Sequence, residues 1–242
     1  MMALAFSGGK DSMACLHLLR DQLDCGIFVD TGYLLPETIH MVNYAASLLP
    51  VMHVVKTDRH RQNEEWGIPA DIVPVDWTRE AELFSGRKAL RIQSWVRCHI
   101  ENVNLPVWGK AKSLGVTHLV YGARKDEEVN SNTQAEQVQD GMTVLCPLAE
   151  WTAPQVLAYL ETKMEVPEHF YSVHDSSSLD CYDCPAFEAT SQNRVAWMKT
   201  KYPEAYAAYA VRHHAIYEAL EEAVKPTGQE RQPRSTSKKE SE

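Results

Sequence analysis

Short apolar runs alternate with amphipathic stretches along the first two thirds of the chain. The apolar runs have the length of buried strands, and in the amphipathic stretches apolar residues recur every three or four positions, as on one face of a helix. We predict strands at 3–6, 25–30, 51–55, 117–121 and 143–146, and helices at 11–23, 36–49, 106–114 and 152–160. This alternation predicts an α/β fold, doubly wound around a largely parallel sheet.

The regular alternation stops in two places. The polar, tryptophan-containing stretch 56–97 predicts an excursion that covers the sheet or lines a pocket, and 122–141 reads as a long polar loop. From 191 to 224 the chain turns helical again, and we predict a packing face from the stripe of Tyr206, Tyr209, His213, Ile216 and Leu220. We therefore expect an α/β domain at 1–172, a cysteine-containing segment with a C-terminal helical extension at 173–224, and a disordered polar tail at 225–242.

Composition narrows the class of protein. The 242 residues include 24 Lys and Arg against 33 Asp and Glu, a formal net charge of −9, which does not favour a broad basic face for nucleic acid. No apolar run approaches the roughly 20 residues that a membrane crossing needs, and the first residues are too short for a signal peptide. We expect a cytoplasmic protein without a membrane partner, in which the six cysteines stay reduced, bind metal or act in redox chemistry.

The segment between the first predicted strand and helix carries the most chemistry. It reads Ser7, Gly8, Gly9, Lys10, Asp11 and Ser12. Two glycines let the backbone turn tightly, the helix that follows points its positive end at the turn, and the serines and lysine add donors. These features predict a site for phosphate. The spacing is not that of the Walker A loop, so a GTPase or motor is excluded.

This segment resembles the PP-loop of the N-type ATP pyrophosphatases, which belong to the adenine nucleotide alpha hydrolase-like proteins. Three further stretches, 30–38, 122–127 and 146–152, resemble the phosphoadenylyl sulfate (PAPS) reductase branch of that superfamily, which also contains the small subunit of ATP sulfurylase. The resemblance covers roughly residues 3–171. It implies an adenine nucleotide, with Mg²⁺, as the ligand.

The predicted strand ends place these stretches at one crevice. We expect a nucleotide-binding site made of Ser7, Gly8, Gly9, Lys10, Asp11, Ser12, Asp30, Thr31, Gly32, Tyr33, Gly122 and Arg124. Lys10, Asp11 and Arg124 are the candidate catalytic residues: the two cations neutralise phosphate, and Asp11 or Asp30 holds Mg²⁺ through water. The alternative for residues 30–32 is a simple turn that caps the next helix.

The chain departs from the reductases in two ways. It lacks their C-terminal Glu-Cys-Gly-x-His segment, since its last cysteine is Cys184, and residues 129–132 lack the second arginine that follows the Gly-x-Arg loop. It also keeps an intact PP-loop, which the reductases tend to lose because their substrate has no β,γ-pyrophosphate. Together these departures favour ATP over a sulfonucleotide.

Three cysteines are candidate metal ligands. Cys181 and Cys184 form a CxxC motif, and Cys98 follows Arg97 where iron–sulfur members of the family have a cysteine pair. Cys98, Cys181 and Cys184 could hold a [4Fe–4S] cluster with one open iron. A zinc site that adds His99 or His174, and a redox-active or unligated thiol pair, are the alternatives. Cys15, Cys25 and Cys146 lie in apolar contexts and are predicted core residues.

Three functions follow. The first is an ATP-dependent enzyme that adenylates a substrate, forming AMP and pyrophosphate, for sulfur transfer. The second is a thiol-dependent reductase of phosphoadenylyl or adenylyl sulfate that releases sulfite, and the third is a nucleotide-binding subunit that needs a partner. The acceptor is a small molecule or a nucleic-acid base, and a sulfur donor is a further expected partner. Four basic residues at 87, 88, 91 and 97 would suit a nucleic acid, although a solvated helix face is the simpler interpretation.

Overall fold

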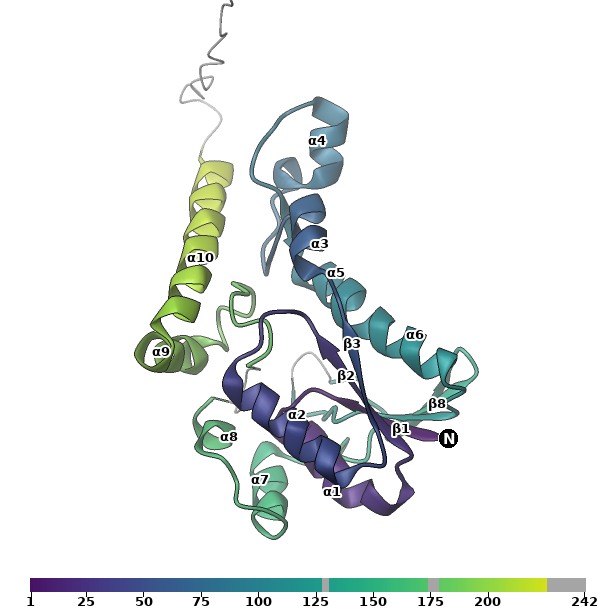
Figure 1. Ribbon diagram of the computed structural model, residues 1–242. Helices are drawn as coiled ribbons and strands as arrows, with labels where there is room; N and C mark the ends of the chain where they lie inside the picture. The colour runs from purple at the N-terminus through teal and green to yellow at the C-terminus, as the bar shows by residue number, and fades with distance from the viewer. Residues whose placement is uncertain (128–130, 174–178, 226–242) are drawn as a thin grey trace, which may run out of the picture.

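A six-stranded sheet forms the centre of the protein. The computed structural model describes residues 1–127, 131–173 and 179–225. The strand order is β3-β2-β1-β6-β8-β7, and within this sheet only β7 runs antiparallel to its neighbour (Figure 1). The strands are β1 (Met2–Phe6), β2 (Cys25–Asp30), β3 (Met52–Lys56), β6 (His118–Val120), β7 (Glu136–Gln139) and β8 (Met142–Leu145). The largely parallel sheet confirms the predicted fold class.

Helices cover both faces of the sheet, because alternate strand residues point to opposite sides. On one face, Leu4 belongs to a buried cluster with Met13 and Leu160. On the other face, Ala3 belongs to a cluster with Ala111. The helices are α1 (Lys10–Leu19), α2 (Pro36–Leu48) and α7 (Ala153–Glu161) on the first face, and α6 (Leu105–Ser113) on the second. The sheet is therefore doubly wound, as the sequence predicts.

The segment between β3 and α5 (Trp95–His99) forms a separate outer lobe (Figure 1). It consists of α3 (Arg59–Trp66), β4 (Ile68–Ala70), a 3₁₀ turn (Val75–Trp77), α4 (Arg79–Ser85) and β5 (Ile92–Ser94), with β4 and β5 paired in parallel. The lobe extends away from the sheet instead of covering it. It lines a cavity of about 200 Å³ with Glu222 and Ala223, so the second of the two expected arrangements is the one observed.

The last of the C-terminal helices, α10 (Pro203–Val224), packs against the lobe. The others are α8 (Glu168–Ser172) and α9 (Gln192–Lys201). The predicted packing stripe on α10 is confirmed: Tyr209 and Ile216 are buried, Ile216 lies in the same cluster as Trp77 and Ile92 of the lobe, and Leu220 packs against that cluster. The predicted disordered tail lies, from residue 226 on, outside the described residues.

Truncation of Ile216 should show how much the lobe depends on α10. We expect Ile216→Ala to lower the free energy of unfolding by about 2 kcal/mol or more, because it removes buried methyl groups and leaves a cavity. Val211, which is 72% exposed on the same helix, supplies the matched control, and Val211→Ala should change stability by less than about 0.5 kcal/mol. Urea unfolding of both variants measures the difference. Equal midpoints would contradict the packing role of the stripe.

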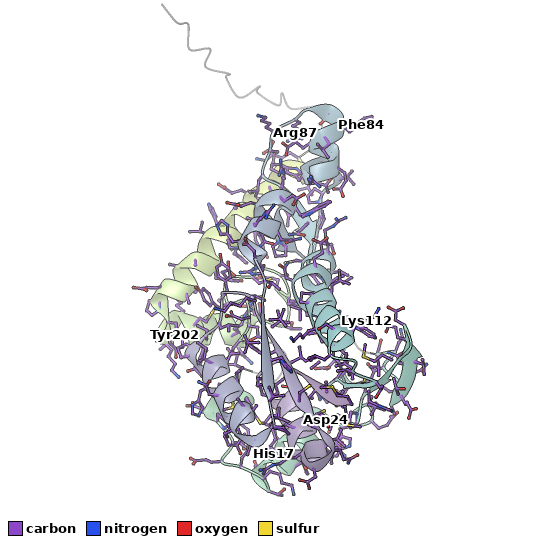
Figure 2. The ribbon with its side chains drawn as sticks, turned by 45° about the vertical axis from the view of Figure 1, so that its right-hand side comes forward. His17, Asp24, Phe84, Arg87, Lys112 and Tyr202 are labelled. Carbon is purple, nitrogen blue, oxygen red and sulfur yellow. The ribbon has the colours of Figure 1, made fainter. Side chains whose placement is uncertain are left out.

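The basic residues of the lobe are mostly paired with carboxylates. Arg91 contacts Glu82 at 2.6 Å, and Arg87 contacts Glu222 at 3.3 Å. Figure 2 shows Arg87 at the outer end of the lobe, near Phe84, whose side chain is 96% exposed. Arg97 contacts a carboxylate of the lobe as well, at 3.4 Å. These ion pairs favour the interpretation as a solvated surface over a nucleic-acid site.

The helix before β6 begins earlier than the sequence predicts. It starts with α5 (Trp95–His99) and continues through a π-helical segment (Ile100–Asn104) into α6. Pro106 suggested a helix start because proline lacks the N–H of a helix interior. The wider π turn directly before it accommodates the missing donor, so the helix runs through this point.

One strand lies in the region predicted to be a loop. β7 pairs with β8 through a two-residue turn in which Asp140 and Gly141 both have positive φ, 51° and 77°. This is the conformation that favours Asp-Gly in tight hairpins. All four residues of β7 are exposed, so no alternation of apolar and polar residues marks the strand in the sequence. Within the described parts of the chain, none of the helices has the length and apolar character needed to cross a bilayer.

Candidate nucleotide site

Three loops meet at the carboxyl edge of the sheet. β1 lies between β2 and β6, so the strand order reverses direction beside β1. In open α/β sheets the crevice at such a switch point is where ligands bind. The residues predicted for the nucleotide lie in the loops after β1, β2 and β6 or directly beside them, and the contacts described below join the loop after β6 to α1.

Hydrogen bonds made by its own serines stabilise the phosphate loop, residues 7–12. Ser12 Oγ donates to the carbonyl of Gly9 at 3.0 Å and accepts from the Ser7 backbone N–H at 3.3 Å. Gly8 has a φ of +84°, a conformation that favours glycine. Among the described residues no side chain caps the N-terminus of α1, so the N–H groups of its first turn remain available to an anion.

Gly122 brings the loop after β6 against this helix. A Cβ at this position would lie 2.8 Å from the Asp11 carbonyl carbon and 2.9 Å from the Ser12 nitrogen. Both atoms belong to the backbone and cannot turn aside as a side-chain end would. Only glycine therefore allows the loop to approach α1 this closely, and the approach places Arg124 beside Asp11.

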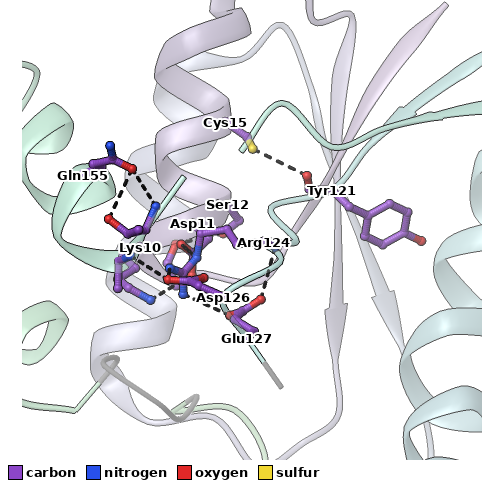
Figure 3. A network of polar contacts seen from close by, with 12 residues as sticks. Lys10, Asp11, Ser12, Cys15, Tyr121, Arg124, Asp126, Glu127 and Gln155 are labelled. Atoms are coloured by element: carbon purple, nitrogen blue, oxygen red, sulfur yellow. Dashed lines mark hydrogen bonds and ion pairs between the residues drawn. The ribbon is translucent and has the colours of Figure 1, made fainter. Parts of the chain in front are cut away.

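Arg124 and Lys10 share a network with three carboxylates (Figure 3). Asp11 contacts Lys10 Nζ at 2.9 Å and Arg124 Nε at 2.8 Å. The two other guanidinium nitrogens of Arg124 face Asp126 at 2.8 Å and Glu127 at 3.3 Å. The guanidinium is thus engaged on all three nitrogens and is 2% exposed. It fixes the position of the carboxylates at the phosphate loop.

The net charge of this network determines whether it can offset the charge of a bound nucleotide. It has two cations and three carboxylates, so it does not by itself offset the charge of a triphosphate. Burial raises the pKa of Asp11 above its usual value, although Lys10 and Arg124 oppose that shift. Mg²⁺ carried by a nucleotide is held by one or two carboxylates, by phosphate oxygens and by water. Asp11 fits that role, since it presents carboxylate oxygens at the N-terminus of α1.

A hydrogen bond to the side chain of Asp30 stabilises the loop after β2. Gly32 donates its backbone N–H to Asp30 Oδ1 at 2.9 Å. The next helix, α2, begins at Pro36 after Leu35 and has no side-chain cap. The interpretation of residues 30–32 as a helix cap is therefore wrong. Thr31 is buried, and its hydroxyl lies 3.2 Å from Cys181 Sγ, so the loop after β2 contacts the CxxC segment.

The structure confirms the predicted role of three of the six cysteines. Cys15, Cys25 and Cys146 are buried among apolar residues, which confirms them as core residues. Among the described residues, no group of three or more His, Cys, Asp and Glu side chains is arranged to hold a metal ion. His174, the second zinc candidate, lies outside the described residues.

The three candidate ligands lie near one another, because Cys184 contributes to the raised pKa of both Cys98 and Cys181. Cys98 Sγ lies 3.5 Å from Asn63 Oδ1, and Cys181 lies against Thr31. Burial raises the pKa of Cys98 to about 11 and of Cys181 to about 12, and it also raises the pKa of Cys184. A bound metal lowers the pKa of its thiol ligands, so these shifts describe the thiols without a metal. The structure does not support the predicted cluster or zinc site, and a metal at these cysteines stays a prediction.

Several residues of the site carry no signal in the sequence. Asp126 and Glu127 follow Arg124 directly, but their ion pairs with it depend on the fold of the loop. Arg59, from the lobe, is 1% exposed, pairs with Asp183 and stacks over the Tyr33 ring at 4.1 Å. Asp183, between the two cysteines, is the hint that the sequence offers, since a carboxylate that becomes buried requires a cation.

Comparison with known proteins agrees with this geometry. The sequence profile of the Phosphoadenosine phosphosulfate reductase domain matches residues 1–187. The chain belongs to the phosphoadenosine phosphosulfate reductase family. Curated protein sequences give no match. In this member of the family, the matched region contains the phosphate loop, the Gly122 approach and the CxxC segment, whereas α9 and α10 follow it.

Solved structures show a likeness of fold. This family member resembles an FMN adenylyltransferase from Candida glabrata, in complex with FAD and inorganic pyrophosphate, at 15% identity and a TM-score of 0.42 over 73% of the chain. It spans about half of that enzyme, 54%. It also resembles a protein described as a predicted subunit of tRNA methyltransferase from Methanocaldococcus jannaschii, at 16% identity and a TM-score of 0.38, over 85% of this chain and 90% of that one. Likenesses this weak carry no argument about function.

Proposed function

We propose that this protein binds Mg-ATP and acts at its α-phosphate, adenylating an acceptor with release of pyrophosphate. The observation that supports this function best is the intact phosphate loop at the uncapped N-terminus of α1. A loop of this kind suits the β- and γ-phosphates, because backbone N–H groups, the helix dipole and Lys10 all favour negative charge there.

The proposed chemistry is a displacement at phosphorus. An oxygen of the acceptor forms a bond to the α-phosphorus, the bond between that phosphorus and the bridging oxygen breaks, and pyrophosphate leaves with the electron pair. Charge grows on the pyrophosphate, where Lys10 and the N–H groups of the loop stabilise it. Mg²⁺, when bound, withdraws charge from the same phosphates. Arg124 is proposed as a positioning residue, because its three nitrogens hold Asp11, Asp126 and Glu127.

Reduction of a sulfonucleotide is the second candidate, and the position of the CxxC segment favours it. Cys181 lies against Thr31, and the Tyr182 N–H donates to the Tyr33 carbonyl at 3.1 Å, so a thiol lies beside one of the three loops of the nucleotide site. In that reaction a thiolate would attack the sulfate sulfur, displace the nucleotide and release sulfite once a second thiol closes a disulfide.

Binding and product analysis separate the two functions. Calorimetric titration of oxygen-free protein with a non-hydrolysable Mg-ATP analogue and with phosphoadenylyl sulfate should show at least tenfold tighter binding of the ATP analogue, about 1.4 kcal/mol. Labelled ATP should yield AMP in the presence of a cell extract that supplies the acceptor. Tighter binding of phosphoadenylyl sulfate, with sulfite release on addition of a thiol reductant, would contradict the adenylating function.

The thiols test the reductase function directly. If it is correct, the double variant Cys181→Ser, Cys184→Ser should lose sulfite release by at least 100-fold while nucleotide binding changes less than threefold, since neither sulfur belongs to the phosphate loop. The matched control is Cys25→Ser, which alters a buried thiol of the sheet. Sulfite release should be measured with phosphoadenylyl sulfate and a dithiol reductant. Unchanged release in the double variant would exclude the two thiols from the reaction.

A further inference from the structure

Three arginine side chains converge on the second half of the CxxC segment. Arg59 and Arg212 both pair with the Asp183 carboxylate, Arg212 through Nε at 3.5 Å. Arg194 donates from Nη2 to the Cys184 carbonyl at 3.0 Å. They come from α3, α10 and α9, which are separate in sequence. We call these three side chains the guanidinium cluster.

The guanidinium cluster contains donors without acceptors. Four of its nitrogens are buried and make neither a hydrogen bond nor an ion pair within the described parts of the chain: Arg59 Nε and Nη1, Arg194 Nε, and Arg212 Nη2. Arg59 is 1% exposed and Arg194 is 5% exposed, so bulk water does not supply the missing acceptors. A buried donor left unsatisfied costs on the order of 1–3 kcal/mol, and more when it is charged. Several such donors at one place indicate that a ligand completes the site.

The net charge of the guanidinium cluster also indicates that a ligand completes the site. All three guanidinium groups stay protonated; Arg59 and Arg212 share one carboxylate, Asp183, and Arg194 bonds to a neutral carbonyl. Two positive charges therefore remain in excess. Buried charge of one sign is unfavourable unless a partner offsets it. An occupant with about two negative charges would restore the balance.

The separate origins of the donors bear on the shape of the occupant. A carboxylate is planar and accepts best from one fork of a single arginine. Here the unsatisfied nitrogens belong to three arginines on three helices, so the acceptor must present oxygens in several directions. A tetrahedral oxyanion such as sulfate or phosphate does this. Arg212 is 21% exposed, which gives the anion a way in from the surface.

We propose that the guanidinium cluster is a binding site for a tetrahedral oxyanion, distinct from the phosphate loop. The same chemistry could come from a free sulfate or phosphate ion or from such a group on a larger ligand. The site lies next to Cys181 through the CxxC turn, in which the Cys184 N–H donates to the Cys181 carbonyl at 2.8 Å. An oxyanion here would therefore lie beside the thiols and close to the loop after β2. This proposal does not depend on the adenylating function.

Titration with inorganic sulfate tests the site. The full chain, purified without oxygen in chloride buffer, should bind one sulfate, and Arg212→Gln should weaken that binding at least tenfold. Arg212 is chosen because it is the most exposed of the three, so its loss is tolerated by the fold; circular dichroism checks this. Arg61→Gln, an exposed arginine on the same helix as Arg59, is the control and should leave binding unchanged. Arg212→Lys should keep part of the affinity, because it retains the charge.

Two further arms separate this site from its alternatives. A saturating non-hydrolysable Mg-ATP analogue should leave sulfate binding in place, and its loss would assign the ion to the phosphate loop and overturn the proposal. Comparison of sulfate with adenylyl sulfate distinguishes a free ion from a nucleotide-borne group, since only the second source gives tighter binding that Arg212→Gln and Lys10→Met both weaken. Stoichiometric iron and acid-labile sulfide in the purified protein, without sulfate binding, would also overturn it.

Discussion

Replacement of Lys10 by methionine is expected to reduce AMP formation by at least 100-fold. Lys10 is 3% exposed and lies at the first turn of α1, where it contacts Asp11. Under the proposed function its ammonium group meets the charge that grows on pyrophosphate, and loss of one such donor typically costs 10²–10³ in rate. Methionine keeps the length of the side chain and removes the charge, so the packing of α1 should be preserved.

Single-turnover kinetics with labelled ATP is the appropriate measurement. Asp11 retains its contact with Arg124 at 2.8 Å in the variant, so we expect folding to survive and the loss to appear in the chemical step more than in stability. Lys112→Met is the control, because this lysine is half exposed on the far helix α6 and contacts only Asp140 among the ion pairs shown. Turnover of Lys10→Met at the wild-type rate would remove the phosphate loop from the reaction.

Replacement of Gly122 by valine is expected to abolish nucleotide binding and to destabilise the fold by about 1–3 kcal/mol. The new side chain would meet the backbone of α1 at less than 3 Å, at the Asp11 carbon and the Ser12 nitrogen. Insertion of atoms into a well-packed contact costs about that much, because the backbone has to shift. The shift moves the N-terminus of α1, and with it the N–H groups that would hold the phosphates.

The control for Gly122→Val is a glycine substitution that is expected to raise stability instead of lowering it. Gly109 lies inside α6 and nothing lies within 4 Å of a Cβ added there. Gly109→Ala should stabilise the protein by about 0.5–1 kcal/mol, since alanine loses less backbone entropy in a helix. Thermal unfolding and calorimetric titration with an Mg-ATP analogue measure both effects. If Gly122→Val binds the nucleotide normally, the close approach of the two loops is not required for the site.

The sequence predicts the central sheet because its strands and helices have clear periods. The strand 25–30 is buried over nearly its whole length, and the amphipathic helices that flank it have one apolar face. The edge strand β7 is not predicted because all four of its residues are exposed and three of them are polar, so burial imposes no pattern on it. The helix start at Trp95 is not predicted for a different reason. A π turn accommodates the N–H that Pro106 lacks, and no local sequence preference indicates that turn.

The phosphate loop can be predicted because its chemistry is local. Ser7, Gly9 and Ser12 bond to one another within six residues of chain. The guanidinium cluster cannot be predicted in this way, since its members pair over long distances in sequence. Arg59 and Arg212 each carry no unusual neighbour in the sequence, and only the folded chain shows that both meet Asp183. The metal prediction for Cys98, Cys181 and Cys184 also depended on distances that spacing along the chain does not determine.

The pairing of Arg59 with Asp183 has a consequence for the order in which the molecule assembles. The two residues are 124 positions apart, and Arg212 joins them from still later in the chain. Closing a loop of that length costs conformational entropy before any contact repays it, so long-range contacts form late in folding. The sheet pairs β1 with β6 over a comparable distance, but all of its strands and the phosphate loop lie before residue 146. During synthesis, nucleotide binding can therefore precede completion of the CxxC segment, which must wait until α10 has emerged.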